Sequence, residues 1–365
     1  MNITKPTLLL DEKKCRLNIE KMLNRAKKFN CNLRPHFKTH QSHKVGEWFK
    51  EYGINSCAVS SLQMAKYFAQ AGWNDITVAF PLNILEHETV NQLAEKISLN
   101  ICMESVETAK NLNEWLKFPI GIFIKTDAGY HRTGIRAEDF TGIEAIVNEL
   151  NKNPLITFKG FLQHAGHTYQ AKGKKEIDKI HAYTSEKMIK LKNYFKKKYS
   201  EIIISNGDTP TCSVCEDFDH IDEMRPGNFV FFDVMQAEIG SCNYEDIAVA
   251  MPCPVVAKHA DRNEVIVYGG AVHFSKDRIE KDGNIIYGLI AEQKDNAWGN
   301  PIPDWYVKKL SQEHGTIHVP DEAFDQIKIG DLLYILPIHS CLTANLISKY
   351  YTLDGKEIEM FRYRS

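Results

Sequence analysis

The sequence predicts an α/β protein in two parts, a (β/α)8 TIM-type barrel followed by a C-terminal all-β domain. Short β-branched runs followed by helical stretches repeat eight times from residue 33 over about 210 residues, which is the size of such a barrel. From about Asp246 the pattern changes to apolar and alternating runs, separated by turn signals such as Asp282–Asn284. No proline- or serine-rich linker separates the parts, so we expect tight packing, with the barrel at 1–244 and the β-domain at 245–365.

Eight barrel strands are expected, at Arg34–Lys38, Ser56–Ser60, Ile76–Phe80, Asn100–Met103, Ile120–Lys125, Phe158–Gln163, Ile202–Ser205 and Phe229–Phe232. The helices expected between them include Ser61–Ala71, Ile84–Lys96, Val106–Leu116, Phe140–Leu150 and Lys174–Lys198. The strands expected in the β-domain are Ile247–Ala257, Glu264–Tyr268, Ile285–Leu289, Thr316–Val319, Leu332–Leu336 and Leu342–Tyr351. The first ten or so residues are expected to pair with this second domain.

The composition is that of a globular protein and argues against several classes of partner. Hydrophobic residues make up 43% of the 365 residues and charged residues 25%, which excludes a disordered or collagen-like chain. The net charge of −2 provides no basic field for nucleic acid or an anionic membrane, and we interpret the basic run Lys192–Lys198 as a solvated helix face. No run of 18 apolar residues occurs and the first ten residues lack a signal-peptide core, so we expect a cytoplasmic protein.

The nine cysteines follow no disulfide framework, and we expect them to be mostly reduced. Cys212 and Cys215 form a Cys-x-x-Cys motif without a second pair. Metal or redox chemistry would explain this spacing, but so would a helix that starts after a loop, and we favour the helix start.

A lysine marks the end of the first expected strand, where a barrel carries its working residues. Lys38 stands where the barrel interior would otherwise be apolar. Loss of hydration lowers the pKa of such a lysine and makes it a nucleophile that can form an imine, although a surface lysine in a polar loop remains the alternative.

Two small-residue turns follow the seventh strand and precede the eighth, and they indicate a phosphate site. Ser205–Thr211 combines a glycine-containing turn with three hydroxyl groups, and Arg225–Asn228 adjoins it. Barrels of this kind commonly build a phosphate site at this place. A phosphate grip together with an imine-forming lysine indicates pyridoxal 5′-phosphate as the cofactor.

These motifs resemble those of a known family. The barrel resembles the fold-type III pyridoxal-phosphate enzymes, the alanine-racemase-like barrels, in the segments Thr7–Asp11, Arg34–His40, Asp127–Gly134, Ser205–Thr211 and Arg225–Asn228. The C-terminal segments Glu313–Gly315 and Pro337–Thr343 resemble the D-serine dehydratase and D-threonine aldolase family, whose second domain carries a metal site. The resemblance spans essentially the whole chain.

The resemblance implies a role for particular residues. Lys38 would bind the cofactor covalently and act as the base at Cα of the substrate, and Arg132 would approach the cofactor ring. The residues that would line the cofactor are His36, His164, Tyr169, Ser205, Gly207, Asp208, Thr209, Gly227 and Asn228. The chain departs from the family at Leu162, because a tyrosine usually stands two positions before the histidine that matches His164.

His339 and Cys341 are the predicted metal ligands. They are two residues apart on an expected strand, so both side chains would point to one face, and an imidazole with a thiolate suits zinc. Zinc is expected, with manganese or magnesium as alternatives, and two protein ligands would leave open positions for water and substrate. Spacing alone would favour a buried histidine beside an incidental cysteine, and the family resemblance reverses that preference.

Other histidines leave alternatives open. His36, His40 and His43 would share one helix face and form a rival metal cluster, although Pro35 argues against a helix there. His131 and His167 are either supporting groups of the site or hydrogen-bonded loop histidines.

The resemblance implies a lyase that acts on a D-3-hydroxy amino acid and works as a homodimer, with the β-domain of one subunit closing the barrel of the other. We expect dehydration to a 2-oxo acid and ammonia, because Cys341 stands where the D-threonine aldolase pattern more often has aspartate. Cα–Cβ cleavage to glycine and an aldehyde is the alternative. A racemase is less favoured because no second base is evident, and so is a non-catalytic carrier of the cofactor, because such carriers are typically a barrel alone.

Overall fold

The computed structural model describes residues 2–295 and 297–362, which form two compact units. The first, here called the barrel unit, comprises residues 20–38 and 46–227. The second, here called the β unit, comprises the described residues of 2–19, 39–45 and 228–362. The domain boundary at 244/245 stays a prediction, and the predicted ends at residues 1 and 363–365 lie outside the described residues.

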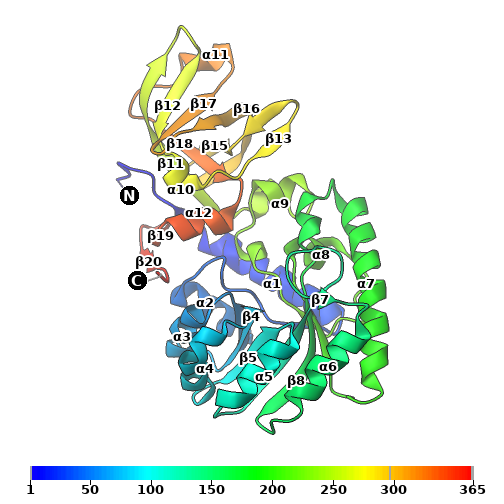
Figure 1. The fold of residues 1–365 in the computed structure, drawn as a ribbon. Helices are drawn as coiled ribbons and strands as arrows, with labels where there is room; N and C mark the ends of the chain where they lie inside the picture. Colours follow the sequence, from blue (N-terminus) through cyan, green and yellow to red (C-terminus); the bar gives the residue numbers. More distant parts are fainter. Residues whose placement is uncertain (1, 296, 363–365) are drawn as a thin grey trace. The chain divides into compact units, whose positions relative to one another are not determined.

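Eight parallel strands form the predicted barrel (Figure 1). Their order is β2-β10-β9-β8-β6-β5-β4-β3, and a bridge between His36 and Ala58 joins the chain after β2 to β3. A short additional strand, β7 (Ile135–Arg136), pairs with the end of β6. The barrel strands are β2 (Asn32–Leu33), β3 (Ser56–Val59), β4 (Asp75–Pro81), β5 (Ser98–Met103), β6 (Ile120–Asp127), β8 (Ile156–Gln163), β9 (Ile203–Asn206) and β10 (Glu223–Met224).

Helices cover the outside of these strands, and several begin at side-chain caps (Figure 1). Ser61 and Ser105 accept hydrogen bonds of 3.1 Å from the backbone N–H groups of Met64 and Thr108, which fixes the starts of α3 and α5. The helical elements from residue 12 to residue 238 are α1 (Glu12–Lys28), α2 (His43–Glu51), α3 (Leu62–Gln70), η1 (Ile84–Glu86), α4 (His87–Ala94), α5 (Val106–Trp115), α6 (Phe140–Leu150), η2 (Gly166–Gln170), α7 (Lys174–Lys196), α8 (Thr209–Val214), η3 (Asn228–Val230) and α9 (Val234–Glu238).

The prediction of the first and the eighth strand is wrong in position. The eighth strand is Glu223–Met224, and the predicted strand Phe229–Phe232 instead runs through η3. All four residues of that run are buried, and a short apolar run cannot by itself distinguish a buried strand from a buried turn. The first strand ends at Leu33, and most of the predicted Arg34–Lys38 has already left the sheet.

The β unit contains a ring of six antiparallel strands. The order is β12-β17-β16-β15-β18-β11, and β11 also pairs with β12, which closes the ring. Strand β1 (Leu9–Leu10) pairs with β11 on one side and with β19 (Lys349–Thr352) on the other, and β19 pairs with β20 (Glu357–Glu359). The ring strands are β11 (Val249–His259), β12 (Glu264–Tyr268), β15 (Gly288–Lys294), β16 (Ala297–Leu310), β17 (His314–His318) and β18 (Leu332–Pro337).

Smaller elements complete the β unit and correct a further prediction. The remaining elements are the hairpin β13 (Ile279–Lys281) and β14 (Asn284–Ile286), and the helices η4 (Tyr244–Asp246), α10 (Ala271–Phe274), α11 (Asp321–Phe324) and α12 (Ser340–Leu346). The strand predicted at Leu342–Tyr351 is wrong, because its first half lies in α12. Leu342 and Leu346 are exposed on this helix while Thr343 is buried, a spacing of four residues that indicates a helix and not an alternating strand. The prediction also lacked α1 and β16.

The interior of the barrel carries an ion network as well as an apolar layer. Arg34 pairs with Asp75 at 2.8 Å and with Glu223 at 2.6 Å. Glu223 is 3% exposed, and it also accepts a hydrogen bond of 2.6 Å from the Ser205 hydroxyl. A layer formed by Cys102, Phe123 and Leu162 packs inside the same barrel. Because these side chains come from seven segments of the barrel unit, their contacts fix the strands relative to one another.

No helix in the described part of the chain combines the length and the apolarity needed to cross a lipid bilayer.

Arg34→Met should lower the free energy of unfolding by about 3–5 kcal/mol, because it leaves the buried Glu223 carboxylate without its cation. Urea unfolding measures this loss. Lys174→Met, which removes an ion pair with Asp178 between exposed side chains, is the matched control and should cost less than about 1 kcal/mol. Equal losses in the two variants would contradict a structural role for the buried network.

Candidate active site

Lys38 lies in a turn two residues beyond the bridging residue His36, at the end of the first barrel segment. Its backbone N–H lies 3.3 Å from Nδ1 of His36. The side chain of Lys38 is exposed, so the expectation of a desolvated lysine inside the barrel is wrong for this residue. The reason is the shortness of β2, since the chain leaves the sheet before it reaches Lys38. The lysine buried inside the barrel is Lys125 on β6, which is 4% exposed.

Two histidines are brought together near Lys38. Burial lowers the pKa of His36 well below its ordinary value, and the charges of Lys38 and Arg225 lower it further. Burial also lowers the pKa of His164, against a hydrogen bond with the Gly207 carbonyl that raises it. Both imidazoles are therefore neutral at neutral pH, and they lie beside a cluster of cationic groups.

The predicted phosphate turn connects β9 to α8. Asp208 is the N-cap of α8, where its Oδ1 accepts hydrogen bonds from the backbone N–H of Thr211 at 2.8 Å and from the hydroxyl of Thr168 at 2.9 Å. The backbone N–H of Thr209 donates to the Tyr169 hydroxyl at 3.2 Å. Tyr169 and the turn are thus in contact, as the predicted cofactor site requires.

The donors of this turn fit a phosphate, although not all the predicted ones are available. Within the described residues, Asn206 Nδ2 and the hydroxyl oxygen of Thr209 are buried without a hydrogen-bond partner. Such buried donors call for a ligand or ordered water. The Ser205 hydroxyl, by contrast, donates to Glu223 and accepts from Arg225 Nε at 2.9 Å, so it belongs to the barrel interior.

The glycines of the two predicted turns have different surroundings. A Cβ on Gly207 would lie 2.8 Å from the guanidinium of Arg225 and 2.9 Å from its carbonyl oxygen, so only glycine fits there. Gly227 is the last residue of this segment of the barrel unit, and Asn228 is the first of the next segment of the β unit. The Asn228 amide donates to Ser340 Oγ at 3.1 Å and to Cys341 Sγ at 3.6 Å, so it lies beside the predicted metal ligands.

His339 and Cys341 meet at the start of a helix and not on a strand, so the predicted strand context is wrong. Strand β18 ends at Pro337, His339 is the extended N-cap of α12, and Cys341 lies in its first turn. Burial alone would lower the pKa of His339, but hydrogen bonds with Asp277 and Cys341 outweigh it and raise the pKa to about 11. Asp277 Oδ2 lies 2.8 Å from His339 Nδ1, and the Thr39 hydroxyl lies 3.1 Å from Cys341 Sγ.

This donor set fits an open metal site. No group of three or more histidine, cysteine, aspartate or glutamate side chains within residues 2–295 and 297–362 is arranged to hold a metal ion. Two protein ligands leave positions for water and substrate, and a carboxylate on the far nitrogen of a ligating histidine is the usual support of such a ligand. The alternative prediction of a metal cluster at His36, His40 and His43 is wrong. It required one helix to carry all three histidines, but α2 begins only at His43.

The Cys212-Cys215 motif lies in the second half and at the end of the short helix α8, whereas the expected position was a helix start. Cys212 lies in α8 and Cys215 is its C-cap. Burial raises the pKa of both thiols, which opposes formation of the thiolate that metal binding and redox chemistry need.

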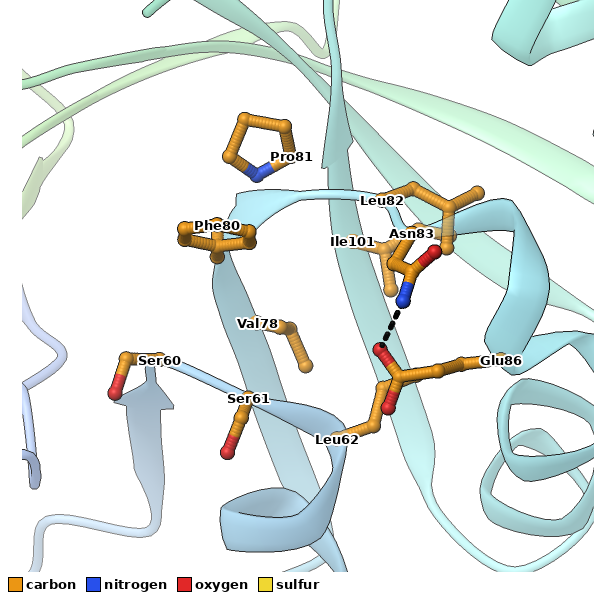
Figure 2. A pocket seen from close by; sticks show the side chains of 10 residues that line it. All are labelled: Ser60, Ser61, Leu62, Val78, Phe80, Pro81, Leu82, Asn83, Glu86 and Ile101. Carbon is orange, nitrogen blue, oxygen red and sulfur yellow. Dashed lines mark hydrogen bonds between the residues drawn. The ribbon is translucent and has the colours of Figure 1, made fainter. Parts of the chain in front are cut away.

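A separate cavity lies on the barrel unit, at the carboxyl ends of β3 and β4 (Figure 2). Its volume is about 260 Å³, and none of the predicted site residues lines it. Figure 2 shows the Asn83 amide donating to Glu86 across its rim, at 3.3 Å. The lining residues are Ser60, Ser61, Leu62, Val78, Phe80, Pro81, Leu82, Asn83, Glu86 and Ile101.

Sequence reasoning missed several residues of the two sites. Lys125 stands two residues after Phe123 on the same strand, so the alternation of side chains along β6 could have placed it inside the barrel. Asp277 and Thr39 are far from the metal ligands in sequence, and no local pattern marks them.

Comparison with known proteins identifies the family. The family model "Alanine racemase, N-terminal domain" matches residues 10–234, more than half of the chain. The chain belongs to this family, the fold-type III pyridoxal-phosphate enzymes. A second family model, "Putative serine dehydratase domain", matches residues 248–353.

Relatives within the fold-type III family cover the whole chain. D-serine dehydratase of Dictyostelium discoideum is 29% identical, with 99% of this chain and 96% of that protein aligned. D-threo-3-hydroxyaspartate dehydratase of Delftia sp. HT23 is 27% identical over 97% of this chain and 96% of that protein. The solved structure of the Delftia enzyme superimposes on this chain with a TM-score of 0.90, and the superposition covers 100% of this chain and 99% of the Delftia chain. D-threonine aldolase from Filomicrobium marinum, at 18% identity and a TM-score of 0.84 over 98% of this chain and 95% of that one, shares the fold.

Lys125→Met should make the cofactor-free protein more stable at pH 7. Burial, aided by the charge of Arg225, lowers the pKa of Lys125 from 10.5 to about 8. Below pH 8 the folded state bears the full cost of the buried ammonium group, on the order of 3 kcal/mol, and this cost disappears as the pH rises from 8 to 10.5. Urea unfolding should therefore show a large advantage of the variant at pH 7 and a smaller one at pH 9.5. A variant less stable than the wild type at pH 7 would show that other contacts compensate the charge.

Proposed function

We propose that this protein is a pyridoxal-phosphate- and metal-dependent lyase that dehydrates a D-3-hydroxy amino acid, D-serine first, to a 2-oxo acid and ammonia. The observation that carries the proposal is the likeness over nearly the full length to two dehydratases, in a chain that pairs His339 with Cys341 at one helix start. Both of those relatives are named for dehydration of a D-amino acid with a 3-hydroxyl group.

The barrel unit offers the residues that would hold pyridoxal phosphate. Lys38 would form the covalent attachment, and the unpartnered donors of Asn206 and Thr209 would bind the phosphate. His164 lies beside Tyr169, with their ring centroids 6.1 Å apart, and would line the cofactor ring. Arg132, exposed on the loop after β6, would approach the same ring.

The β unit offers the residues that would hold the metal ion. His339 and Cys341 would ligate it, and Asp277 would orient His339 through the hydrogen bond to Nδ1. A thiolate with an imidazole favours zinc over manganese or magnesium. One solved structure of D-threo-3-hydroxyaspartate dehydratase is a cysteine-to-alanine mutant described as the metal-free form, which supports a metal in that enzyme.

When bound, pyridoxal phosphate supplies an electron sink for charge that develops at Cα, and a divalent metal ion supplies a Lewis acid for the β-hydroxyl. In the proposed mechanism Lys38 Nζ accepts the proton from Cα of the substrate. The neutral imidazoles of His36 and His164 add no further positive charge beside that ammonium group. The electron pair left at Cα forms the Cα–Cβ double bond while the hydroxyl leaves Cβ with its own electron pair and takes up a proton to depart as water. Hydrolysis of the released enamine then yields the 2-oxo acid and ammonia.

Aldol cleavage remains the second candidate function because the D-threonine aldolase shares the fold over nearly the whole chain. At 18% identity, however, that likeness supports the fold and not the reaction. Cys341 in place of an aspartate favours dehydration.

Product analysis decides between the two reactions. The purified protein is incubated with D-serine, D-threonine and D-threo-3-hydroxyaspartate, and the 2-oxo acid and glycine formed are both measured. Dehydration predicts 2-oxo acid and ammonia in equal amounts without glycine, whereas glycine with an aldehyde would establish cleavage. The L-enantiomers serve as controls.

Lys38→Ala should abolish both the visible absorption of the bound cofactor and the product. Lys66→Ala, at an exposed position of α3, is the matched control and should retain both. A Lys38→Ala protein that keeps a chromophore reducible by borohydride and attached to the chain would show that another lysine binds the cofactor.

Removal of the metal should abolish product formation and leave the visible spectrum of the cofactor nearly unchanged, because different residues hold the two groups. Cys341→Ala should do the same, and Cys341→Asp should respond better to manganese, since oxygen ligands suit harder ions. Asp277→Asn should weaken zinc binding by about 10–100-fold, measured by competition with a chelator. Full turnover by protein whose metal content is confirmed near zero would remove the metal from the mechanism.

We also propose that the protein is cytoplasmic and works as a homodimer. Both rest on the family resemblance and on the sequence pattern, and light scattering of the active protein tests the dimer.

A further inference from the structure

The side chain of Tyr130 connects two loops of the barrel unit, one after β6 and one after β8. Its ring stacks on that of His167, with centroids 5.9 Å apart and planes at 22°. The ring of His164 meets it edge-on, at 5.8 Å and 81°. The guanidinium of Arg132 lies over the same ring, 5.3 Å from its centroid. One aromatic ring therefore contacts both His164 and Arg132, two residues of the proposed cofactor site.

The ring of Tyr130 packs directly against the backbone of Gly166. A Cβ at position 166 would lie 2.3 Å from Cε1 and 2.4 Å from Cζ of Tyr130. The backbone of Gly166 has no positive φ that would demand glycine, so the close approach of the ring is what excludes a side chain. The absence of a side chain at Gly166 therefore leaves the space that the Tyr130 ring occupies beside the loop after β8.

The loop that carries Tyr130 is itself fixed at its base. Asp127 Oδ1 accepts hydrogen bonds of 2.9–3.0 Å from the backbone N–H groups of Gly129, Tyr130 and His131. The ring of His131 lies 2.9 Å from the other carboxylate oxygen. These bonds hold the backbone that presents Tyr130 but do not reach the β8 loop. The tyrosine ring supplies the connection between the loops.

We propose that Tyr130 is a positioning residue, whose ring holds Arg132 and His164 in the geometry in which they receive the cofactor. This inference rests on the proposed function, because it assigns Tyr130 a purpose toward the same site. A rigid ring with two side-chain torsions performs this task at a low cost in conformational entropy. The ring of His167, which stacks on that of Tyr130, then supports it.

Four variants test the proposal: Tyr130→Phe, Tyr130→Leu, Gly166→Ala and the double variant Gly166→Ala/Tyr130→Leu. Affinity for pyridoxal phosphate is measured by absorbance without substrate, together with kcat/KM on D-serine. Tyr130→Leu should weaken cofactor binding about tenfold, which is about 1.4 kcal/mol, because it removes two aromatic contacts and one cation–π contact. Tyr130→Phe should stay within about twofold of the wild type, since the contacts involve the ring.

Gly166→Ala should reproduce the loss seen with Tyr130→Leu, because the new methyl group displaces the ring. In the double variant the methyl group has no ring to displace, so its effect should not add to that of Tyr130→Leu. The matched control is Tyr194→Leu, which removes a ring stacked on Phe140 at 4.8 Å and should leave cofactor affinity unchanged. Thermal melting of each variant identifies any loss that comes from unfolding.

Wild-type affinity in Tyr130→Leu and Gly166→Ala, or strictly additive losses in the double variant, would overturn the proposal. A wild-type protein that binds pyridoxal phosphate but converts no D-3-hydroxy amino acid would contradict the proposed function alone, since the binding measurements still decide the role of Tyr130. A wild-type protein that binds no pyridoxal phosphate would contradict both.

Discussion

The buried carboxylate of Glu223 is the group on which the interior of the barrel unit depends. It accepts a hydrogen bond from Ser205, and Ser205 in turn accepts one from Arg225. Arg225 lies so close to Gly207 that no side chain fits there, and the Gly207 carbonyl bonds the ring of His164. A charge inside the barrel therefore orients a residue of the proposed cofactor site through a chain of direct contacts. Side-chain networks of this kind hold a geometry because each member is costly to leave without a partner.

The β unit positions its proposed ligands by another means, the start of a helix. His339 and Cys341 flank the first residue of α12, and each has a polar neighbour from elsewhere in the unit, Asp277 for the imidazole and Thr39 for the sulfur. Separate segments of the chain therefore supply the ligands and the groups that orient them. A metal site differs from two donors that merely lie close together in that neighbouring groups orient its ligands.

The sequence predicts the fold better than it predicts the surroundings of the sites. The β-then-α alternation gave the barrel, and α6 has the predicted bounds, because periodicity reports which face of an element is buried. Strand β10 has only two residues, which is too short to show an alternation of apolar and polar side chains. The prediction therefore placed the eighth strand at the nearby apolar run Phe229–Phe232. Lys38 was predicted from its place at the end of the first expected strand, and His339 and Cys341 were predicted through the resemblance. Asp277 was missed because it meets His339 across 62 residues of chain.

The pairing of β1 constrains the order in which the chain can fold. Leu9 pairs with Ala250 on one side and with Tyr351 on the other. A ribosome makes this strand before the barrel sequence, and its two partners are made only after that sequence, about 240 and 340 residues further along the chain. Leu8, Leu9 and Leu10 are buried in the folded protein. Until their partner strands have been made, these apolar side chains are exposed to water or bound by chaperones. Contacts between residues so far apart in sequence form slowly because their loop-closure entropy must be lost first. The β unit is therefore completed only after the barrel has been synthesised, and β1 is ordered long after it has been made.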